Sequence, residues 1–196
     1  MIRDALLFII GLLNDFINPV MGSTDDQVVP GNIALLDAFN DSSTQNVNNK
    51  IVASIVNIQQ EGTLRNLPNT RTITGEDGLP KGIRQSPEIY LNVYVLFAAN
   101  NTNYDNALFY ISKVIGFFQQ EHVFTPATHP GLNPNIEKLI LDLYSMSFEE
   151  LNQLWSIMGG KYTPSVMYKM RMLAIQEAEE SDAGIIRSLG TTPNSL

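Results

Sequence analysis

The sequence predicts a single α/β domain of mixed α+β type, in which a central sheet of about four to five strands is flanked by three helices. The strongest strand pattern, residues 87–99, is apolar on both faces, which is typical of a central strand covered on each side. Residues 104–120 follow it with apolar residues at helical spacing. A length of 196 residues and a hydrophobic content of 44% suit one domain with a sizeable core.

The N-terminal residues 2–18 are predicted to form a helix that ends before Pro19, because the residue preceding a proline disfavours helical geometry. Apolar residues also occupy the other faces of this helix, so it should be buried on several sides. The cover could come from the core of the domain alone or from a subunit contact as well. The residues at helical spacing are Ile2, Leu6, Ile9, Leu13, Phe16 and Ile17.

The apolar run of residues 5–13 superficially resembles a signal peptide, because Arg3 precedes it. Asp4 adjoins the run, however, and no small-x-small cleavage site follows it. A run of this length is also too short for a bilayer core of about 30 Å. We therefore expect a buried or interface helix rather than a targeting signal, and no membrane insertion.

The next part of the chain mixes loops with strands. Residues 21–49 are polar and rich in turn residues, with one short strand expected within 28–39. Residues 50–60 are β-branched and alternating, and form a predicted strand. Residues 62–86 are punctuated by glycine and proline and form a long predicted loop. Because a loop of this length is usually functional or disordered, we interpret it as a protruding arm that could order against a neighbour.

The helix at residues 104–120 should turn one apolar stripe toward the sheet and still leave apolar residues over. Phe109 and Phe117 do not share the stripe, so we expect them at the surface, where large apolar groups indicate a contact. The predicted stripe consists of Tyr104, Ala107, Leu108, Ile111, Val114, Ile115 and Phe118.

A connection and a strand follow this helix. Residues 122–134 contain several prolines and form the connection. Residues 136–144 alternate as a strand, with Leu139, Leu141 and Leu143 facing inward.

The C-terminal part begins with a third helix. Ser147 and Glu150 have the spacing of a capping box, and the helix should end at Gly159. Residues 165–177 form the final predicted strand, with the side chains of Tyr168 and Arg171 on opposite faces. We expect the domain to span residues 1–178, followed by a flexible acidic and polar tail at residues 179–196.

Composition argues against several functions. The formal net charge is −8, so the surface repels phosphate backbones and disfavours anionic membranes; no nucleic-acid partner is expected. The chain has no cysteine, which excludes disulfides and thiolate metal ligands. This fits the reducing cytosol or a particle that must survive both inside and outside a cell.

The sequence offers no convincing active site. His122 and His129 are the only histidines, and no HExxH pattern, GxSxG motif, phosphate-binding loop or GxGxxG motif is present. Two loop histidines without such context favour a structural interpretation. We therefore predict no catalytic residue, no metal ligand and no cofactor, and we keep a small metal-dependent hydrolase using His122 and His129 as the weakest alternative.

Residues 148–175 carry a pattern that resembles the end of the tail-terminator, or cap, proteins of extracellular contractile injection systems, which are phage-tail-like particles. Two further segments resemble the same family: Thr63–Pro68, with Arg65 and Asn66, and the strand-then-helix unit at residues 86–118. The motif positions in the C-terminal segment are Leu151, Leu154, Trp155, Ser156, Gly159, Tyr162, Pro164, Ser165, Tyr168 and Arg171.

The resemblance implies a tail-terminator-like fold and a structural protein rather than an enzyme. Such a protein would form a hexameric ring on the distal end of the tail and bind the last layers of inner tube and sheath. It would be cytoplasmic during assembly and then part of a particle that can be released. The short tail of this chain also implies no extra anchoring domain. A tube-initiating or baseplate adaptor of the same machine is the main alternative.

The sequence allows more than one role for several motif residues. Trp155 could plug the core beneath its helix or anchor an interface. Tyr168 could be structural for a similar reason. Arg171 could be structural or could form an ion pair between subunits.

Overall fold

Six strands form the main sheet of the molecule, in the order β1-β2-β5-β8-β7-β6. A computed structural model describes residues 1–35, 47–61, 70–74, 80–84, 89–159, 162–174 and 181–183. Strand β1 runs parallel to β2, and every other neighbouring pair in this sheet is antiparallel. The strands are β1 (Val28–Pro30), β2 (Lys50–Gln60), β5 (Ile89–Asn100), β6 (Val123–Phe124), β7 (Ile136–Tyr144) and β8 (Ser165–Ala174).

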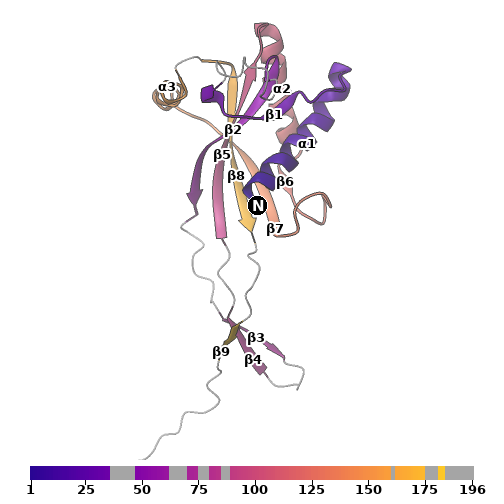
Figure 1. The fold of residues 1–196 in the computed structure, drawn as a ribbon, viewed down its shortest axis with the longest axis vertical. Helices are drawn as coiled ribbons and strands as arrows, with labels where there is room; N and C mark the ends of the chain where they lie inside the picture. Colours follow the sequence, from indigo (N-terminus) through magenta and orange to yellow (C-terminus); the bar gives the residue numbers. More distant parts are fainter. Residues whose placement is uncertain are drawn as a thin grey trace, which may run out of the picture.

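Three α-helices cover the two faces of this sheet (Figure 1). Helices α1 (Ile2–Met21) and α2 (Tyr104–Gln120) pack on one face and share a hydrophobic core with it. Helix α3 (Phe148–Ile157) packs on the other face over a second, smaller core, and a short 3-10 helix (Ile33–Leu35) lies on the same side. The mixed sheet with three helices confirms the predicted fold class.

The strand count is higher than predicted because the additional strands are short. The predicted connection at residues 122–134 contains the two-residue strand β6, which is too short to show an alternating pattern. Of the expected strand region 28–39 the structure describes residues 28–35, and within these Val28–Pro30 form a strand, β1. Both short strands lie at the edges of the sheet, where few ladder hydrogen bonds are needed.

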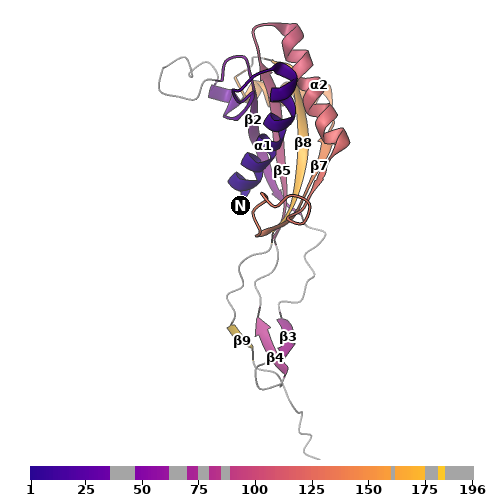
Figure 2. The same ribbon diagram turned by 90° about the vertical axis from the view of Figure 1, so that its right-hand side faces the viewer.

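A smaller sheet contains β3 (Thr70–Thr74), β4 (Pro80–Arg84) and β9 (Ser181–Ala183) in that order. Figures 1 and 2 show it beyond the end of the main sheet, past the termini of β5 and β8. The prediction that residues 62–86 form only loop is therefore wrong, because β3 and β4 pair within it. The prediction that residues 165–177 hold the last strand is also wrong, since β9 follows.

These differences concern the arm and the tail of the sequence. The described part of the predicted strand 165–177 ends at Ala174, and residues 175–177 lie outside the described residues. β9 lies inside the segment 179–196 that we expected to be a tail. Residues 62–69, 75–79 and 85–86 of the predicted arm, and residues 87–88 of the predicted strand 87–99, are also outside the described residues.

Helix α1 continues three residues beyond its predicted end at Asn18. Pro19 lacks only its own N–H, so a single hydrogen bond is lost, and a last turn still forms after it. Gly22, in a left-handed conformation with φ of 60°, then ends the helix, and its N–H is directed to the carbonyl oxygens of Asn18 and Pro19.

The buried Asn14 ties α1 to β1. Its side-chain N–H donates to the Val28 carbonyl at 2.9 Å, and its Oδ1 accepts from the backbone N–H groups of Gln27 at 3.0 Å and Val28 at 2.8 Å. Strand β1 bonds to β2 on its other side. The Asn14 amide therefore satisfies the backbone hydrogen bonds on the side of β1 that faces away from β2, as a neighbouring strand would.

Helix α2 has the predicted bounds but a different inward face. Its buried residues are Ala107, Tyr110, Val114, Phe117 and Phe118. Of the predicted stripe, only Ala107, Val114 and Phe118 are buried. The helix is apolar around more than half of its circumference, so spacing alone could not choose between its flanks.

Two contacts decide how α2 is rotated. Phe118 packs on Tyr168 of β8 with ring centroids 4.5 Å apart, and Phe117 packs on Phe16 of α1 at 5.3 Å. Phe117 is therefore buried rather than exposed, whereas Phe109 is 38% exposed as predicted.

Strand β7 departs from its predicted pattern at one end. Leu139 and Leu141 are buried as predicted, but Leu143 is 55% exposed. β6 pairs only with Leu139 and Ile140, so Leu143 lies on a stretch of β7 that β6 does not reach.

Candidate functional site

Three of the four motif residues of α3 face the sheet, whereas Ser156 is exposed. Leu151 and Leu154 pack against the smaller core, and Trp155 is 5% exposed within it. Its neighbours in that cluster include Val52 of β2 and Met167 of β8. Within one copy of the chain, Trp155 therefore plugs the core beneath α3. Its indole N–H is buried and has no hydrogen-bond partner among the described residues.

A capping box begins α3, and the motif residues Ser156 and Gly159 lie near its C-terminal end. Ser147 accepts the Glu150 N–H at 3.2 Å, and the Glu150 carboxylate accepts the Ser147 N–H at 2.8 Å, which confirms the predicted capping box. The Ser156 hydroxyl donates to the Asn152 carbonyl at 2.7 Å. Gly159 has φ of 100°, a conformation that other residues rarely adopt, so the helix ends there as predicted.

The motif then leads into β8. Tyr162 is 61% exposed, and its ring meets that of Trp155 edge-on at 5.6 Å. The Pro164 carbonyl accepts the Ala99 N–H at 2.9 Å, and Ser165 lies opposite Ala98 of β5. These two residues thus begin the pairing of β8 with the centre of the sheet.

Tyr168 is a core residue. It is 3% exposed, and its ring contacts those of Phe97 at 6.0 Å and Phe118 at 4.5 Å. Burial disfavours the phenolate and raises the pKa of Tyr168 to about 12. The side chain therefore acts as an uncharged packing group.

Arg171 lies on the opposite face of β8 and is paired within the chain. Its Nε and Nη2 both lie 2.8 Å from Oδ2 of Asp142 on β7. Both side chains are nearly half exposed, so the pair contributes little to stability. Arg65 and Asn66, the other predicted motif residues, lie outside the described residues.

The two histidines do not form a metal centre in the described part of the chain. His122 is exposed. Nε2 of His129 lies 3.5 Å from a Glu121 carboxylate oxygen, and its ring packs edge-on against Phe8 and Phe124. No group of three or more His, Asp or Glu side chains that could hold a metal occurs among the described residues.

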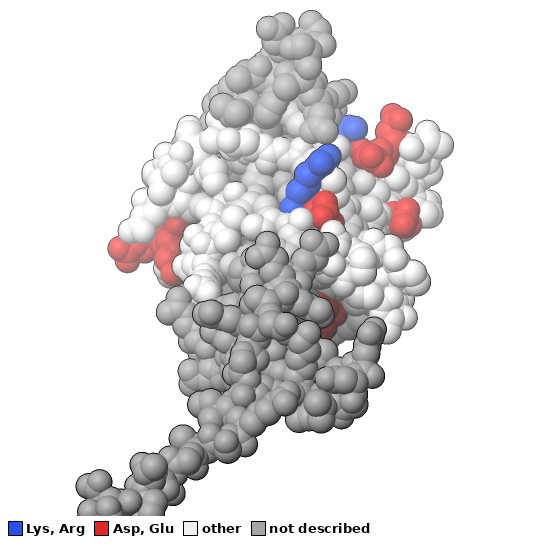
Figure 3. All heavy atoms as spheres, turned by 60° about the horizontal axis from the view of Figure 1, so that its bottom comes forward, with Lys and Arg blue, Asp and Glu red and all other residues white. Residues whose placement is uncertain are grey.

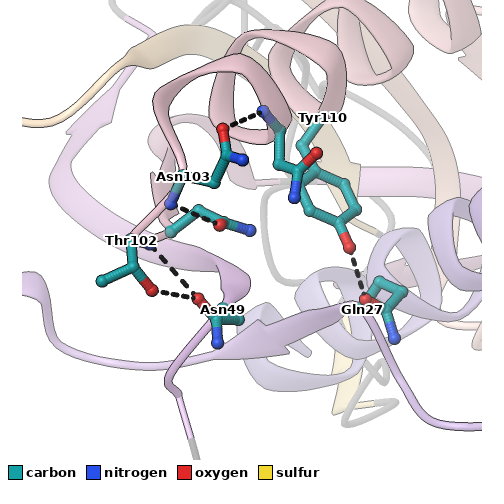
Figure 4. A pocket seen from close by; sticks show the side chains of 7 residues that line it. Gln27, Asn49, Thr102, Asn103 and Tyr110 are labelled. Carbon is teal, nitrogen blue, oxygen red and sulfur yellow. Dashed lines mark hydrogen bonds between the residues drawn. The ribbon is translucent and has the colours of Figure 1, made fainter.

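A polar hollow of about 690 Å³ lies at the start of α2 (Figure 4). Amide oxygens around it hold the neighbouring loops together: Asn103 accepts the Asp105 N–H at 2.9 Å, and Asn49 accepts the Thr102 hydroxyl at 2.8 Å. The Tyr110 hydroxyl donates to Gln27 at 2.7 Å. None of its lining residues carries a charge, so we assign these side chains to loop structure rather than to catalysis.

Exposed apolar side chains form a row on α2. Tyr104, Leu108 and Ile115 are 64%, 44% and 37% exposed, and Ile111 between them is partly buried. We call Tyr104, Leu108, Ile111 and Ile115 the α2 seam. Sequence reasoning assigned these residues to the core and therefore missed the seam; the surplus of apolar residues on this helix was the available signal. Other exposed apolar side chains are Phe148 and Ile157 at the two ends of α3, Tyr162 beyond it, and Leu7, Val20 and Met21 on α1.

The main sheet has incompletely paired edges. β1 pairs with β2 only at Ile51–Ala53, so Ile55–Gln59 have β5 as their one neighbour among the described strands. On the other edge, β6 stops at Ile140, and Asp142–Tyr144 have only β8 among those strands. Such edges can accept an additional strand.

The surface carries little positive charge. In the view of Figure 3, acidic side chains of the described residues are scattered over the surface and outnumber basic ones. Helix α1 is long and apolar enough to span a membrane by length and composition, a criterion that core helices also meet. Its residues Ala5, Leu13 and Ile17 are fully buried in the core.

Comparison with known proteins identifies relatives of this fold. The profile of the family described as the Pvc16 N-terminal domain matches residues 7–188. The structure resembles the sheath/tube terminator of an extracellular contractile injection system, PVC, in its extended state, with a TM-score of 0.57 and 13% identity. It also resembles the tube-terminating cap of the anti-feeding prophage, with a TM-score of 0.51 and 13% identity. No curated protein matches the sequence.

These matches differ in coverage. The first covers 100% of this chain and 64% of the terminator, and the second covers 76% of this chain and 51% of the cap. The chain thus spans less than two thirds of each structure. The first is named as a sheath/tube terminator of an extracellular contractile injection system and the second as a tube-terminating cap, so the predicted resemblance to tail terminators is confirmed. The prediction of a structural protein rather than an enzyme agrees with these matches.

Proposed function

The chain belongs to the Pvc16 N-terminal domain family, and on this basis we propose that it terminates the tail of a contractile injection system. The observation that carries the proposal is the extent of the match, residues 7–188 of 196. Two solved structures that resemble this fold are named as a terminator and a cap, which favours the distal end of the tail over a tube-initiating or baseplate position.

The finer proposal is that copies of the chain form a ring, with six copies as the expected number, against the last layers of inner tube and sheath. A tube of stacked rings grows without limit unless something blocks its end. A blocking ring needs one face that fits the growing end and another that accepts no further subunit. The open edges of β2 and β7 and the exposed apolar residues of α2 and α3 supply contact surfaces that one copy leaves uncovered.

Parts of the chain have different expected roles in this ring. We propose that the smaller sheet of β3, β4 and β9 reaches a neighbouring subunit or the sheath. Arg65 and Asn66 lie close in sequence to β3 and belong to this proposal. The motif residues Leu151, Leu154 and Trp155 pack between α3 and the sheet. Tyr162, which follows α3 in the sequence, is exposed and available for a contact.

The proposal also concerns where the protein works. Assembly would take place in the cytoplasm, and the cap would leave the cell with the particle. The comparison structures come from an extracellular injection system and from the anti-feeding prophage, which supports membership in such a particle.

Deleting the gene tests the role directly. We expect tails of abnormal and variable length, because nothing stops the addition of tube and sheath layers. Restoring the full chain should restore a narrow length distribution in electron micrographs. A normal distribution in the deletion strain would contradict the terminator role. Gold labelling of a tagged chain separates the alternatives, since label at the baseplate end would favour an initiating or adaptor function.

A further inference from the structure

We propose that the α2 seam is the surface through which one copy of the chain contacts a second copy. This inference rests on the proposed ring, and it identifies which part of the subunit the neighbouring copy occupies. The seam is defined by Tyr104, Leu108, Ile111 and Ile115.

The spacing of the seam suits packing against another helix. Its residues are separated by four, three and four positions, so they align along one flank of α2. This alternation of three and four is the spacing by which helices interlock in coiled coils. The seam extends over about 16 Å, at 1.5 Å per residue, which is enough for roughly three turns of a partner helix.

No described element of the same copy covers this flank. Phe117 contacts α1 on one flank, and Phe118 points down to the sheet. The seam occupies the flank of α2 away from α1, where Tyr104 and Leu108 remain exposed. The layer of helices on this face therefore ends with an uncovered apolar side.

The exposed Leu143 lies on the face of the sheet that α2 covers. Leu143 lies opposite Tyr168 in the β7–β8 pair, and the Tyr168 ring touches Phe118 of α2. This face therefore has an uncovered apolar residue on the sheet as well as the seam on the helix.

Charge favours a second copy as the occupant. Each chain carries a net charge of −8, so copies repel one another over most of their surface. The seam contains no acidic or basic residue, and α2 as a whole has one acid, Asp105, and one base, Lys113. Two like-charged copies can therefore approach here at a low electrostatic cost, whereas a basic partner would gain more at acidic surfaces elsewhere.

Photocrosslinking in the assembled particle tests this occupant. Leu108 is replaced by the photoreactive residue p-benzoylphenylalanine, and Phe109, on another flank of the same helix and 38% exposed, is replaced likewise as a control. We expect irradiation of the Leu108 variant to give a product near twice the 21.8 kDa chain mass, and mass spectrometry to identify two copies of this chain. The Phe109 variant should give little of it.

Three results would overturn the inference while leaving the terminator role intact. These are a crosslink from position 108 to tube or sheath protein, a crosslink confined to one copy, and equal dimer yields from both positions. Failure of the chain to enter the particle at all, with tails of normal length, would overturn the terminator role and the inference together.

A second variant gives an independent measurement. Leu108→Asp should weaken association between copies at least about tenfold, because contact would remove an unpaired carboxylate from water. Phe109→Asp should change it much less. Both positions are exposed in the single copy, so circular dichroism should be unchanged. Undiminished association of a folded Leu108→Asp chain would contradict the proposal.

Discussion

Replacing Asn14 by leucine tests how α1 is joined to the sheet. Asn14 is 6% exposed and makes three hydrogen bonds of 2.8–3.0 Å to the backbone of Gln27 and Val28. Leucine has a similar size, so the substitution removes these bonds without opening a large cavity. The N–H and C=O groups of Val28, a residue with 0% exposure, would then be buried without these partners.

The expected loss follows from these contacts. The two buried groups of Val28 that lose their partners cost about 1–3 kcal/mol each, and the lost bond from the Gln27 N–H costs about 1 kcal/mol. The better helix propensity of leucine returns about 0.5 kcal/mol. The free energy of unfolding should therefore fall by about 3–6 kcal/mol, a large part of the stability of a typical domain.

Urea unfolding measures this change. The chain has one tryptophan, Trp155, which is 5% exposed, so its fluorescence reports loss of the core alongside far-UV circular dichroism. Asp15→Ala on the same helix is the matched control; Asp15 is exposed, and its replacement should change stability by less than about 0.5 kcal/mol. A loss below about 1 kcal/mol for Asn14→Leu would refute the idea that this amide replaces a neighbouring strand for β1.

Three further substitutions have expected outcomes. Gly22→Ala should cost about 1 kcal/mol in urea unfolding, because alanine must adopt φ of 60° although no atom crowds its Cβ; an unchanged midpoint would contradict this. Arg171→Ala should change stability by less than about 0.5 kcal/mol, since the ion pair with Asp142 is exposed, and a larger loss would mean that the pair is coupled to other contacts. The pKa of Tyr168 is about 12 in the folded chain against 10.0 for the free side chain, so its contribution to stability is complete below pH 10 and is lost as pH rises toward 12. Tyr168→Phe should remove that part of the alkaline loss, and an unchanged alkaline unfolding profile would contradict the assignment.

The sequence predicted the central elements because they have long, consistent patterns. Residues 50–60 and 104–120 match β2 and α2, and the capping box at Ser147 located the start of α3. Local chemistry is enough in these places, because cap and pattern agree.

Other features depend on tertiary contacts that no local pattern contains. The rotation of α2 is decided by Phe117 against Phe16 and by Phe118 against Tyr168, which are distant in sequence. Leu143 is exposed although it continues the alternation of Leu139 and Leu141, so burial at this end of β7 depends on which elements pack over it. β3 and β4 are short and lie in a segment rich in glycine and proline, where the strand signal is weak.

The candidate surfaces were predictable only in part. A surplus of apolar residues was evident from composition, and Phe109 is exposed as predicted. The sequence could not show which apolar residues of α2 are exposed, because Tyr104, Leu108 and Ile115 fit a buried stripe as well as an exposed one. The resemblance at residues 148–175 indicated the family, but most of its motif residues support α3 and β8 rather than forming the surface.

The incompletely paired edges of the main sheet lie at opposite ends of it. Ile55–Gln59 are toward the end where β2 finishes, whereas Asp142–Tyr144 are at the end where β2 begins, opposite the start of β8. A foreign strand could therefore dock at one height on one side of the subunit and at another height on the other side. In a closed ring of such subunits, the two kinds of free strand edge would lie at different heights along the strand direction. Each kind would then be repeated around the ring at its own height, so that the two faces of the ring could bind different partners.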